Sequence, residues 1–253
     1  MLNFPNDRIP LRISPCPIID AILEIRYLPS TPLEVMVGMV YEKLQQRHKN
    51  DNSIQLGQLQ RLPVNDIPIA VRNNDENLKN QPHYIVDYNG LSFRVAMNNV
   101  SVAIKDAYPG WDSFRKGAKD IIEAVNLLDT IKAPLRIGLR YTSFFSSNIF
   151  EQTKLELKLF GNETLQANNA IFTNWNDGDL SCSLQIANNV IVSKDKQTKQ
   201  GSIIDVDVAT KDAATINVTR IDEILEDLHN YEKKVFFNLL ADTLLETLNP
   251  VYN

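Results

Sequence analysis

Leu23-Glu24-Ile25-Arg26-Tyr27 has a near copy in the second half of the chain, Ile137-Gly138-Leu139-Arg140-Tyr141. Each copy opens a similar series of predicted elements, and self-similarity of this kind indicates repeated structural units. We therefore predict two related halves, residues 1–130 and 131–253, packed as one body.

The first half begins with a half-buried strand at residues 18–27, because apolar and polar residues alternate over most of this segment. A helix is expected from the Thr31-Pro32 pair to about residue 48. Asn89-Gly90 lies between two alternating runs and is a strong signal for a β-hairpin. The remaining predictions for this half are a possible strand at 54–62, a strand at 100–105 and an amphipathic helix over about 111–128.

The second half begins with a strand from Pro134 to about Phe145. Residues 148–160 fit a helix or a strand, since Leu155, Leu157 and Leu159 alternate. We expect further strands at roughly 170–175, 179–187, 189–194 and 202–209, a polar loop at 194–200, and a long helix from about 220 to 248.

Each half thus has the predicted order strand, helix, antiparallel strands, helix. That order is typical of a helix-grip or TATA-binding-protein-like module, and the apolar stripe of the last helix needs a sheet to cover. The fold class predicted is α+β, with two such modules in tandem forming one continuous curved antiparallel sheet with helices on one face.

The composition argues against several functional classes. The 253 residues carry a formal charge of −5 and a pI near 5.3, whereas nucleic-acid-binding domains are usually basic. The densest lysine run, at 194–199, is interrupted by Asp195. No secretory leader or apolar span is recognisable, and two isolated cysteines fit a reducing compartment. We expect a cytoplasmic protein with no membrane contact.

Known catalytic and cofactor motifs do not stand out. The glycine loops of nucleotide-binding proteins and the serine elbow of esterases are missing, and the three histidines are not at ligand spacing. Asp205 and Asp207 share one strand face, as Mg²⁺ ligands would, but the alternation of a half-buried strand produces the same pattern. We predict no catalytic residue, no metal site and no cofactor.

The polar face of the repeated strand is the best candidate for a ligand- or partner-binding site. Its charged residues are Asp20, Glu24, Arg26, Arg136 and Arg140. If the two copies lie antiparallel, one register places Asp20 opposite Arg140 and Glu24 opposite Arg136, leaving Arg26 unpaired. Two interpretations stay open: cross-strand ion pairing between the halves, or a polar groove floor in which Arg26 contacts a ligand.

Several motifs, taken in order, carry a resemblance to a known family. They are Pro15-Cys16-Pro17 before Glu24-Ile25-Arg26-Tyr27, then Tyr108–Phe114, Arg136–Tyr141, Ile204-Asp205-Val206-Asp207 and Leu228-His229. Together they resemble a sporadically distributed, uncharacterised prokaryotic protein family of similar length. That resemblance implies that the chain is one coherent unit, and it brings no activity or catalytic residue with it.

The leading functional hypothesis is a non-enzymatic binding protein that presents a concave polar sheet surface to a protein or small-molecule partner. One alternative is a nucleic-acid-binding saddle, which the acidic balance opposes. The other is a metal-dependent enzyme using Asp205 and Asp207 with a third acid such as Asp20.

Overall fold

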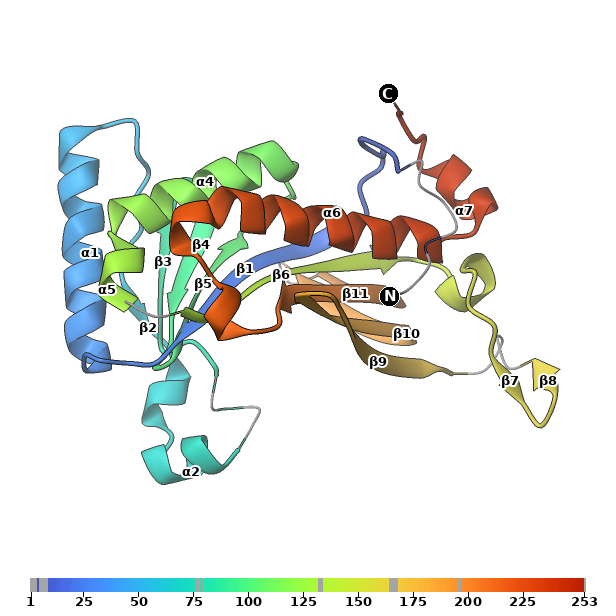
Figure 1. Cartoon of the computed structure of the whole chain (residues 1–253), viewed down its shortest axis with the longest axis horizontal. Coiled ribbons are helices and arrows are strands. Elements are labelled where there is room, and N and C mark those ends of the chain that lie inside the picture. The colour runs from blue at the N-terminus through green and yellow to red at the C-terminus, as the bar shows by residue number, and fades with distance from the viewer. Residues whose placement is uncertain are drawn as a thin grey trace. The chain divides into compact units, whose positions relative to one another are not determined.

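The computed structural model describes residues 4, 9–75, 78, 80–131, 134–163, 168–194 and 197–252 (Figure 1). It is an α+β protein, as predicted. Its strands are β1 (Ile18–Tyr27), β2 (Gln60–Arg61), β3 (Tyr84–Tyr88), β4 (Leu91–Val95), β5 (Asn99–Ile104), β6 (Pro134–Phe145), β7 (Lys158–Leu159), β8 (Asn162–Glu163), β9 (Ala170–Asp177), β10 (Leu180–Lys194) and β11 (Gln197–Thr210). Its α-helices are α1 (Leu33–Asn50), α2 (Ile69–Asn74), α4 (Trp111–Ala124), α5 (Leu127–Ile131), α6 (Ile221–Leu239) and α7 (Asp242–Thr247).

Nine strands form one open antiparallel sheet in the order β2-β3-β4-β5-β1-β6-β11-β10-β9. The two copies of the repeated segment, in β1 and β6, are neighbours in that order, as we expected. A separate pair, β7-β8, forms a small second sheet.

The chain divides into two compact units. The first unit contains Ile22–Gly138 and Asp212–Arg220, and the second contains Met1–Ala21, Leu139–Lys211 and Ile221–Asn253. Strands β1 and β6 each contribute residues to both units.

The alternation of β1 separates a buried face from a polar face, as predicted. In the first unit Leu23, Ile25 and Tyr27 are each 2% exposed. Helix α1 lies on this buried side, where the hydroxyl of Tyr27 contacts Met36 Sδ at 3.0 Å. The residues between them, including Glu24, therefore face the opposite side of the sheet.

The predicted hairpin forms around Asn89-Gly90. Tyr88 pairs with Leu91, and both turn residues have positive φ, at 49° and 78°. A two-residue turn of this kind matches the right-handed twist of the flanking strands, and Asn and Gly tolerate its backbone angles. The hairpin fixes which residues of β3 and β4 share a face.

In the second unit α6 packs on the sheet, as its apolar stripe required. His229 lies against the ring of Tyr141, with centroids 6.0 Å apart, and Trp175 Nε1 donates to the hydroxyl of Tyr231 at 2.9 Å. Leu225 and Leu228 are at most 1% exposed. These contacts join α6 to β6 and β9.

Four details of the second half differ from the prediction. The expected strands 179–187 and 189–194 are one strand, β10, with a register shift between Ala187 and Val190. Asn189 takes a positive φ of 55° there, because a bulge inserts extra residues without ending the strand. β11 already begins at Gln197, so the predicted polar loop is mostly strand; residues 195 and 196 lie outside the described part.

The third difference is the terminal helix, which stops at Leu239 and resumes as α7. Lys154 N donates to Leu239 O at 2.7 Å, and Thr153 forms an isolated β-bridge with Leu240. These backbone contacts to a distant segment replace the helical ladder.

The fourth difference concerns residues 148–160, which fitted a helix or a strand and had to be a helix for the two halves to share one order of elements. Residues 149–152 form only a 3₁₀ turn, followed by β7. Among the described residues, the second half therefore lacks a counterpart of α1. No helix in the described part of the chain is long and apolar enough to cross a membrane.

Candidate functional site

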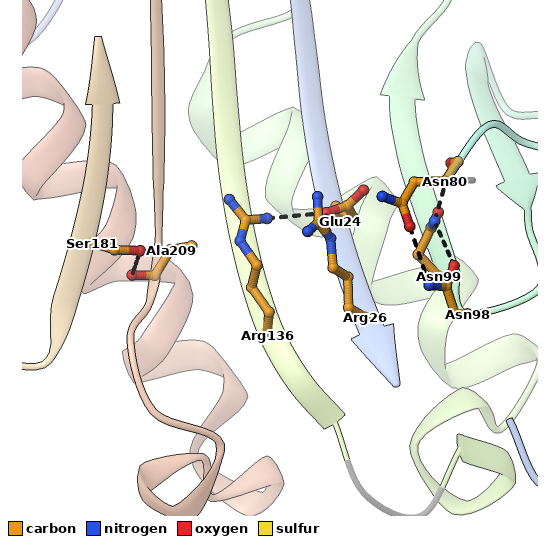
Figure 2. A network of polar contacts seen from close by, with 8 residues as sticks. All are labelled: Glu24, Arg26, Asn80, Asn98, Asn99, Arg136, Ser181 and Ala209. Atoms are coloured by element: carbon orange, nitrogen blue, oxygen red, sulfur yellow. Dashed lines mark hydrogen bonds and ion pairs between the residues drawn. The ribbon is translucent and has the colours of Figure 1, made fainter. Parts of the chain in front are cut away.

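On the polar face of the first unit, the carboxylate of Glu24 accepts hydrogen bonds from two guanidinium groups (Figure 2). Arg26 Nε donates to Glu24 Oε1 at 2.7 Å from the same strand, and Arg136 Nη1 donates to the same oxygen at 3.0 Å from β6. The predicted Glu24–Arg136 pair is thus confirmed. The prediction that Arg26 is unpaired is wrong, because residues two apart in a strand project to the same face and can reach one another.

Gly138 makes room for the Arg136 side chain. A Cβ atom at Gly138 would lie 2.2 Å from Arg136 Nη1 and 2.7 Å from its Cζ, so the guanidinium lies against the bare backbone. In the repeated segment, Gly138 occupies the position that Glu24 has in the first copy. The difference between the two copies therefore creates the space through which Arg136 reaches Glu24.

This polar face continues from β1 across β5 to β4. Glu24 pairs with Ser101, which pairs with Arg94, and Arg26 pairs with Asn99. Arg94 is half-buried, and among the described residues it forms no hydrogen bond or ion pair. It is a guanidinium that the rest of this face leaves unneutralised.

Sequence reasoning missed Arg94, although a signal was present. In the hairpin strand Leu91–Val95, Phe93 is fully buried and Val95 is 2% exposed, so the alternation places Arg94 on the opposite face. We had not connected that strand to the repeated segment, because nothing local shows that β5 joins β4 to β1.

A second ion pair on this face, between Lys105 and Asp87, carries no net charge. Lys105 Nζ lies 2.6 Å from Asp87 Oδ2, and Ser92 Oγ donates to Asp87 Oδ1 at 2.9 Å. Arg26 and Arg136 both contact Glu24, and Arg94 pairs with no described carboxylate. Arg94 is therefore an unneutralised cation on this face, in a chain whose net charge is negative.

Amide side chains border the site beside Arg26. Asn99 Nδ2 donates to Asn80 O at 3.1 Å, and Asn98 Nδ2 donates to Asn80 Oδ1 at 3.1 Å (Figure 2). These bonds hold the turn between β4 and β5 against the segment before β3. The edge of the site is thus fixed by neutral hydrogen bonds and adds no charge.

Arg140 belongs to a different cluster, in the second unit. Its Nε and Nη2 donate to Asp205 Oδ1 and Oδ2 at 2.8 and 2.7 Å, and Thr142 Oγ1 donates to Oδ2 at 2.8 Å. The hydrogen bond to Asp205 raises the pKa of Arg140, and the charges of Asp207 and Asp20 add to that effect. The acidic partner of Arg140 is therefore Asp205, whereas we had expected Asp20.

The contacts of Asp205 in this cluster argue against the hypothesis of a metal site. The carboxylate of Asp205 already accepts from a guanidinium and a hydroxyl, both of which a cation would have to displace. Within the described residues, no group of three His, Cys, Asp or Glu side chains converges as a metal site would require. Asp205 and Asp207 share one strand face through strand alternation, and Asp205 is already paired with Arg140.

Two further titratable groups are buried in the second unit. Burial raises the pKa of Glu232 on α6 to about 8 and the pKa of the Cys182 thiol to about 12. The Cys182 thiol is 2% exposed, and a thiol whose pKa is raised by burial is a poor nucleophile.

No protein-family model matches the chain, and comparisons with curated proteins and with solved structures find no match.

Proposed function

We propose that this protein is a non-enzymatic binding protein whose polar sheet face, formed by Arg26, Arg94, Arg136 and Glu24, receives an acidic segment of a partner protein. The observation that carries the proposal is the guanidinium of Arg94, which makes no hydrogen bond or ion pair with the described residues of that face. Arginine is well suited to this role, because its planar fork matches carboxylate geometry and it is more weakly hydrated than lysine.

The arrangement of the three arginines favours an extended partner over a small ion. Arg94, on β4, and Arg136, on β6, are separated by β5 and β1. Three strand spacings of about 4.8 Å put them roughly 14 Å apart along the sheet. One small anion cannot bridge that distance, but successive carboxylates of an extended peptide can.

Part of the site is already in position before a partner arrives. Glu24 orients the Arg26 and Arg136 side chains, and Gly138 leaves space for Arg136. Side chains that are already ordered lose less conformational entropy on binding.

We also propose that the two halves derive from a tandem duplication of a helix-grip or TATA-binding-protein-like module. In support, the neighbours of β1 run β5, β4, β3, while those of β6 run β11, β10, β9. Each series ends in the chain with a helix, α4 or α6. The 3₁₀ turn after β6 would then be the remnant of a lost helix.

Nucleic acid is the competing occupant, since a row of arginines also suits phosphates. The acidic balance of the chain opposes it, because no continuous basic track extends beyond this face. A direct comparison of the two polyanions decides between them.

The test is titration of the protein with a short oligoglutamate peptide and, separately, with random duplex DNA, both at physiological salt. We expect saturable peptide binding that weakens about fivefold in Arg94→Gln and in Arg136→Gln, since each charge-assisted contact contributes about 1 kcal/mol. Lys49→Gln is the matched control. It removes the same charge from the exposed end of α1, the helix that packs on the opposite face.

Equal peptide affinity in the wild-type protein and both arginine variants would overturn the proposal. Sub-micromolar duplex binding that is tighter than peptide binding would replace it with the nucleic-acid alternative.

A further inference from the structure

A pocket of about 490 Å³ lies within the first unit, and its lining shares no residue with the polar sheet face described above. It is lined by the loop Pro29–Glu34, Asn65, Ile69, Arg72, His83 and Met97. β1 ends just before this loop, β3 begins just after His83, and Met97 lies between β4 and β5, so the pocket sits at the ends of the strands. Its volume is within the roughly 300–1,000 Å³ typical of small-molecule sites.

Hydrogen bonds fix the tautomer of His83, one of the residues that line the pocket. Asn65 Nδ2 donates to the carbonyls of Leu62 and His83, at 3.2 and 2.7 Å, which identifies Oδ1 as the acceptor facing the ring. His83 Nδ1 lies 2.6 Å from that oxygen and therefore carries the proton. Arg72 Nη1 lies 2.9 Å from both ring nitrogens, and the deprotonated Nε2 is the one that can accept from it.

His83 is an uncharged hydrogen-bond partner of Arg72. The imidazole is 3% exposed, and burial lowers its pKa, with the Arg72 charge acting in the same direction and Glu34 opposing. A neutral ring accepts the Nη1 hydrogen bond without neutralising the guanidinium. Arg72 thus keeps its full positive charge inside the pocket.

One donor of this guanidinium has no partner. Arg72 Nε is buried, and in the described part of the chain it makes no hydrogen bond. A buried N–H group without a partner costs free energy, and native proteins rarely leave one in that state. Nη1 is occupied by His83, and Nε and Nη2 form the other hydrogen-bonding edge of the guanidinium.

The same chain shows what that edge binds. Arg140 holds the carboxylate of Asp205 through Nε and Nη2, at 2.8 and 2.7 Å. This two-point contact is the geometry in which guanidinium and carboxylate match best. Arg72 has the same edge, and it is one of the residues that line the pocket.

The other lining residues limit the net charge of the ligand and favour an apolar part in it. Pro29, Leu33, Ile69 and Met97 supply apolar surface. Glu34 is the carboxylate among the lining residues, and it is exposed at the start of α1. It would repel a second negative charge on anything bound by Arg72.

We propose that this pocket binds a small aliphatic monocarboxylate, with its carboxylate on the Nε/Nη2 edge of Arg72 and its apolar body against the proline- and methionine-containing wall. Glu34 selects against dicarboxylates and phosphate esters. The site is independent of the polar sheet face, so either proposal can fail without the other.

The test uses 4-methylpentanoate, its neutral analogue 4-methylpentan-1-ol, and a dicarboxylate of similar length, each titrated into isotopically labelled protein by NMR. We expect saturable binding of the monocarboxylate with a dissociation constant of about 1 mM or tighter, at least about tenfold tighter than the alcohol or the dicarboxylate. Arg72→Gln should abolish this preference, and Arg72→Lys, which keeps the charge but loses the fork, should weaken monocarboxylate binding about tenfold.

Glu34→Gln supplies a gain-of-binding test that misfolding cannot mimic. The dicarboxylate should bind this variant about tenfold more tightly than the wild-type protein, while monocarboxylate affinity changes little. Lys49→Gln, on the same helix and outside the lining, should leave all three affinities unchanged.

Failure of the monocarboxylate to saturate, equal affinity for the alcohol, or unchanged affinity in both Arg72 variants would overturn the proposal. Unchanged dicarboxylate affinity in Glu34→Gln would overturn the selectivity assigned to Glu34.

Discussion

Both units contain a cluster of arginine and acidic side chains. Arginines outnumber acids in the cluster of the first unit, and acids outnumber arginines in the cluster of the second. In the first unit two guanidiniums share one carboxylate, and the side chains of Arg26 and Glu24 are 40% and 21% exposed. In the second unit one guanidinium serves Asp205, whose side chain is 8% exposed, with Asp207 acting on it as well. The second unit therefore buries acid and needs its arginine for stability, whereas the first also carries Arg94, which has no partner among the described residues.

Loss of Arg140 should have the largest effect on stability. Arg140→Met keeps much of the apolar stem but leaves Asp205 buried with only its threonine donor. Removing one partner of a buried pair typically costs 3–5 kcal/mol, and we expect about 3 kcal/mol because the Arg140 side chain is 49% exposed. Denaturant unfolding measures this change.

Arg136→Met is the matched comparison in the first unit. Glu24 keeps its bond to Arg26 there, so we expect a change of about 1 kcal/mol or less. Equal losses in the two variants would show that the two clusters do not differ in the way described.

The buried acid on α6 should make the stability of the second unit fall as the pH rises from 4.5 to about 8. The pKa of Glu232 is about 8 in the folded protein, against an ordinary value of 4.5. Its protonated form stabilises the fold fully below pH 4.5, and that stability is lost as the pH rises through 8.

Glu232→Gln should remove this loss. We expect the variant to match the wild-type protein near pH 5 and to exceed its stability by about 2 kcal/mol near pH 9. Parallel stability–pH curves for the two proteins would contradict the assignment.

Gly138→Ala should have a smaller effect, confined to the first unit. The new methyl group would meet the end of the Arg136 side chain, which is flexible and can move away. We expect a loss of about 1 kcal/mol from the weakened Glu24 pair and the displaced guanidinium. A double-mutant cycle with Arg136→Met should show that the two changes are not additive; full additivity would place Arg136 elsewhere.

Arg94→Gln should have the smallest effect on stability, below about 0.5 kcal/mol, since no described residue pairs with Arg94. Thermal and denaturant unfolding should both overlay with the wild-type protein. A larger loss would mean that Arg94 has a structural role and that the first unit has no surplus cation.

Local patterns in the sequence predicted much of the first unit. The alternation of Leu23, Ile25 and Tyr27 gave the buried face of β1, and Asn89-Gly90 gave the hairpin, because each depends on residues close together in the chain. The repeated segment also correctly predicted that β1 and β6 are neighbours.

The candidate sites were harder to predict, because their members come from distant elements. Arg72 lies on a short helix for which we had no prediction, and His83 looked like an isolated residue before a strand. Their contact joins α2 to the residue just before β3, and no periodicity in the sequence encodes it.

The sequence by itself determined the faces of the strands, the turn at Asn89-Gly90 and the charged residues of the repeated segment, since these follow from backbone geometry and side-chain period. Only the tertiary structure decided which charges meet. Asp205 lies on β11, the strand beside β6 in the sheet, and so it reaches Arg140 in place of Asp20. Ion pairing depends on strand order and register over long sequence separations, which local alternation cannot specify.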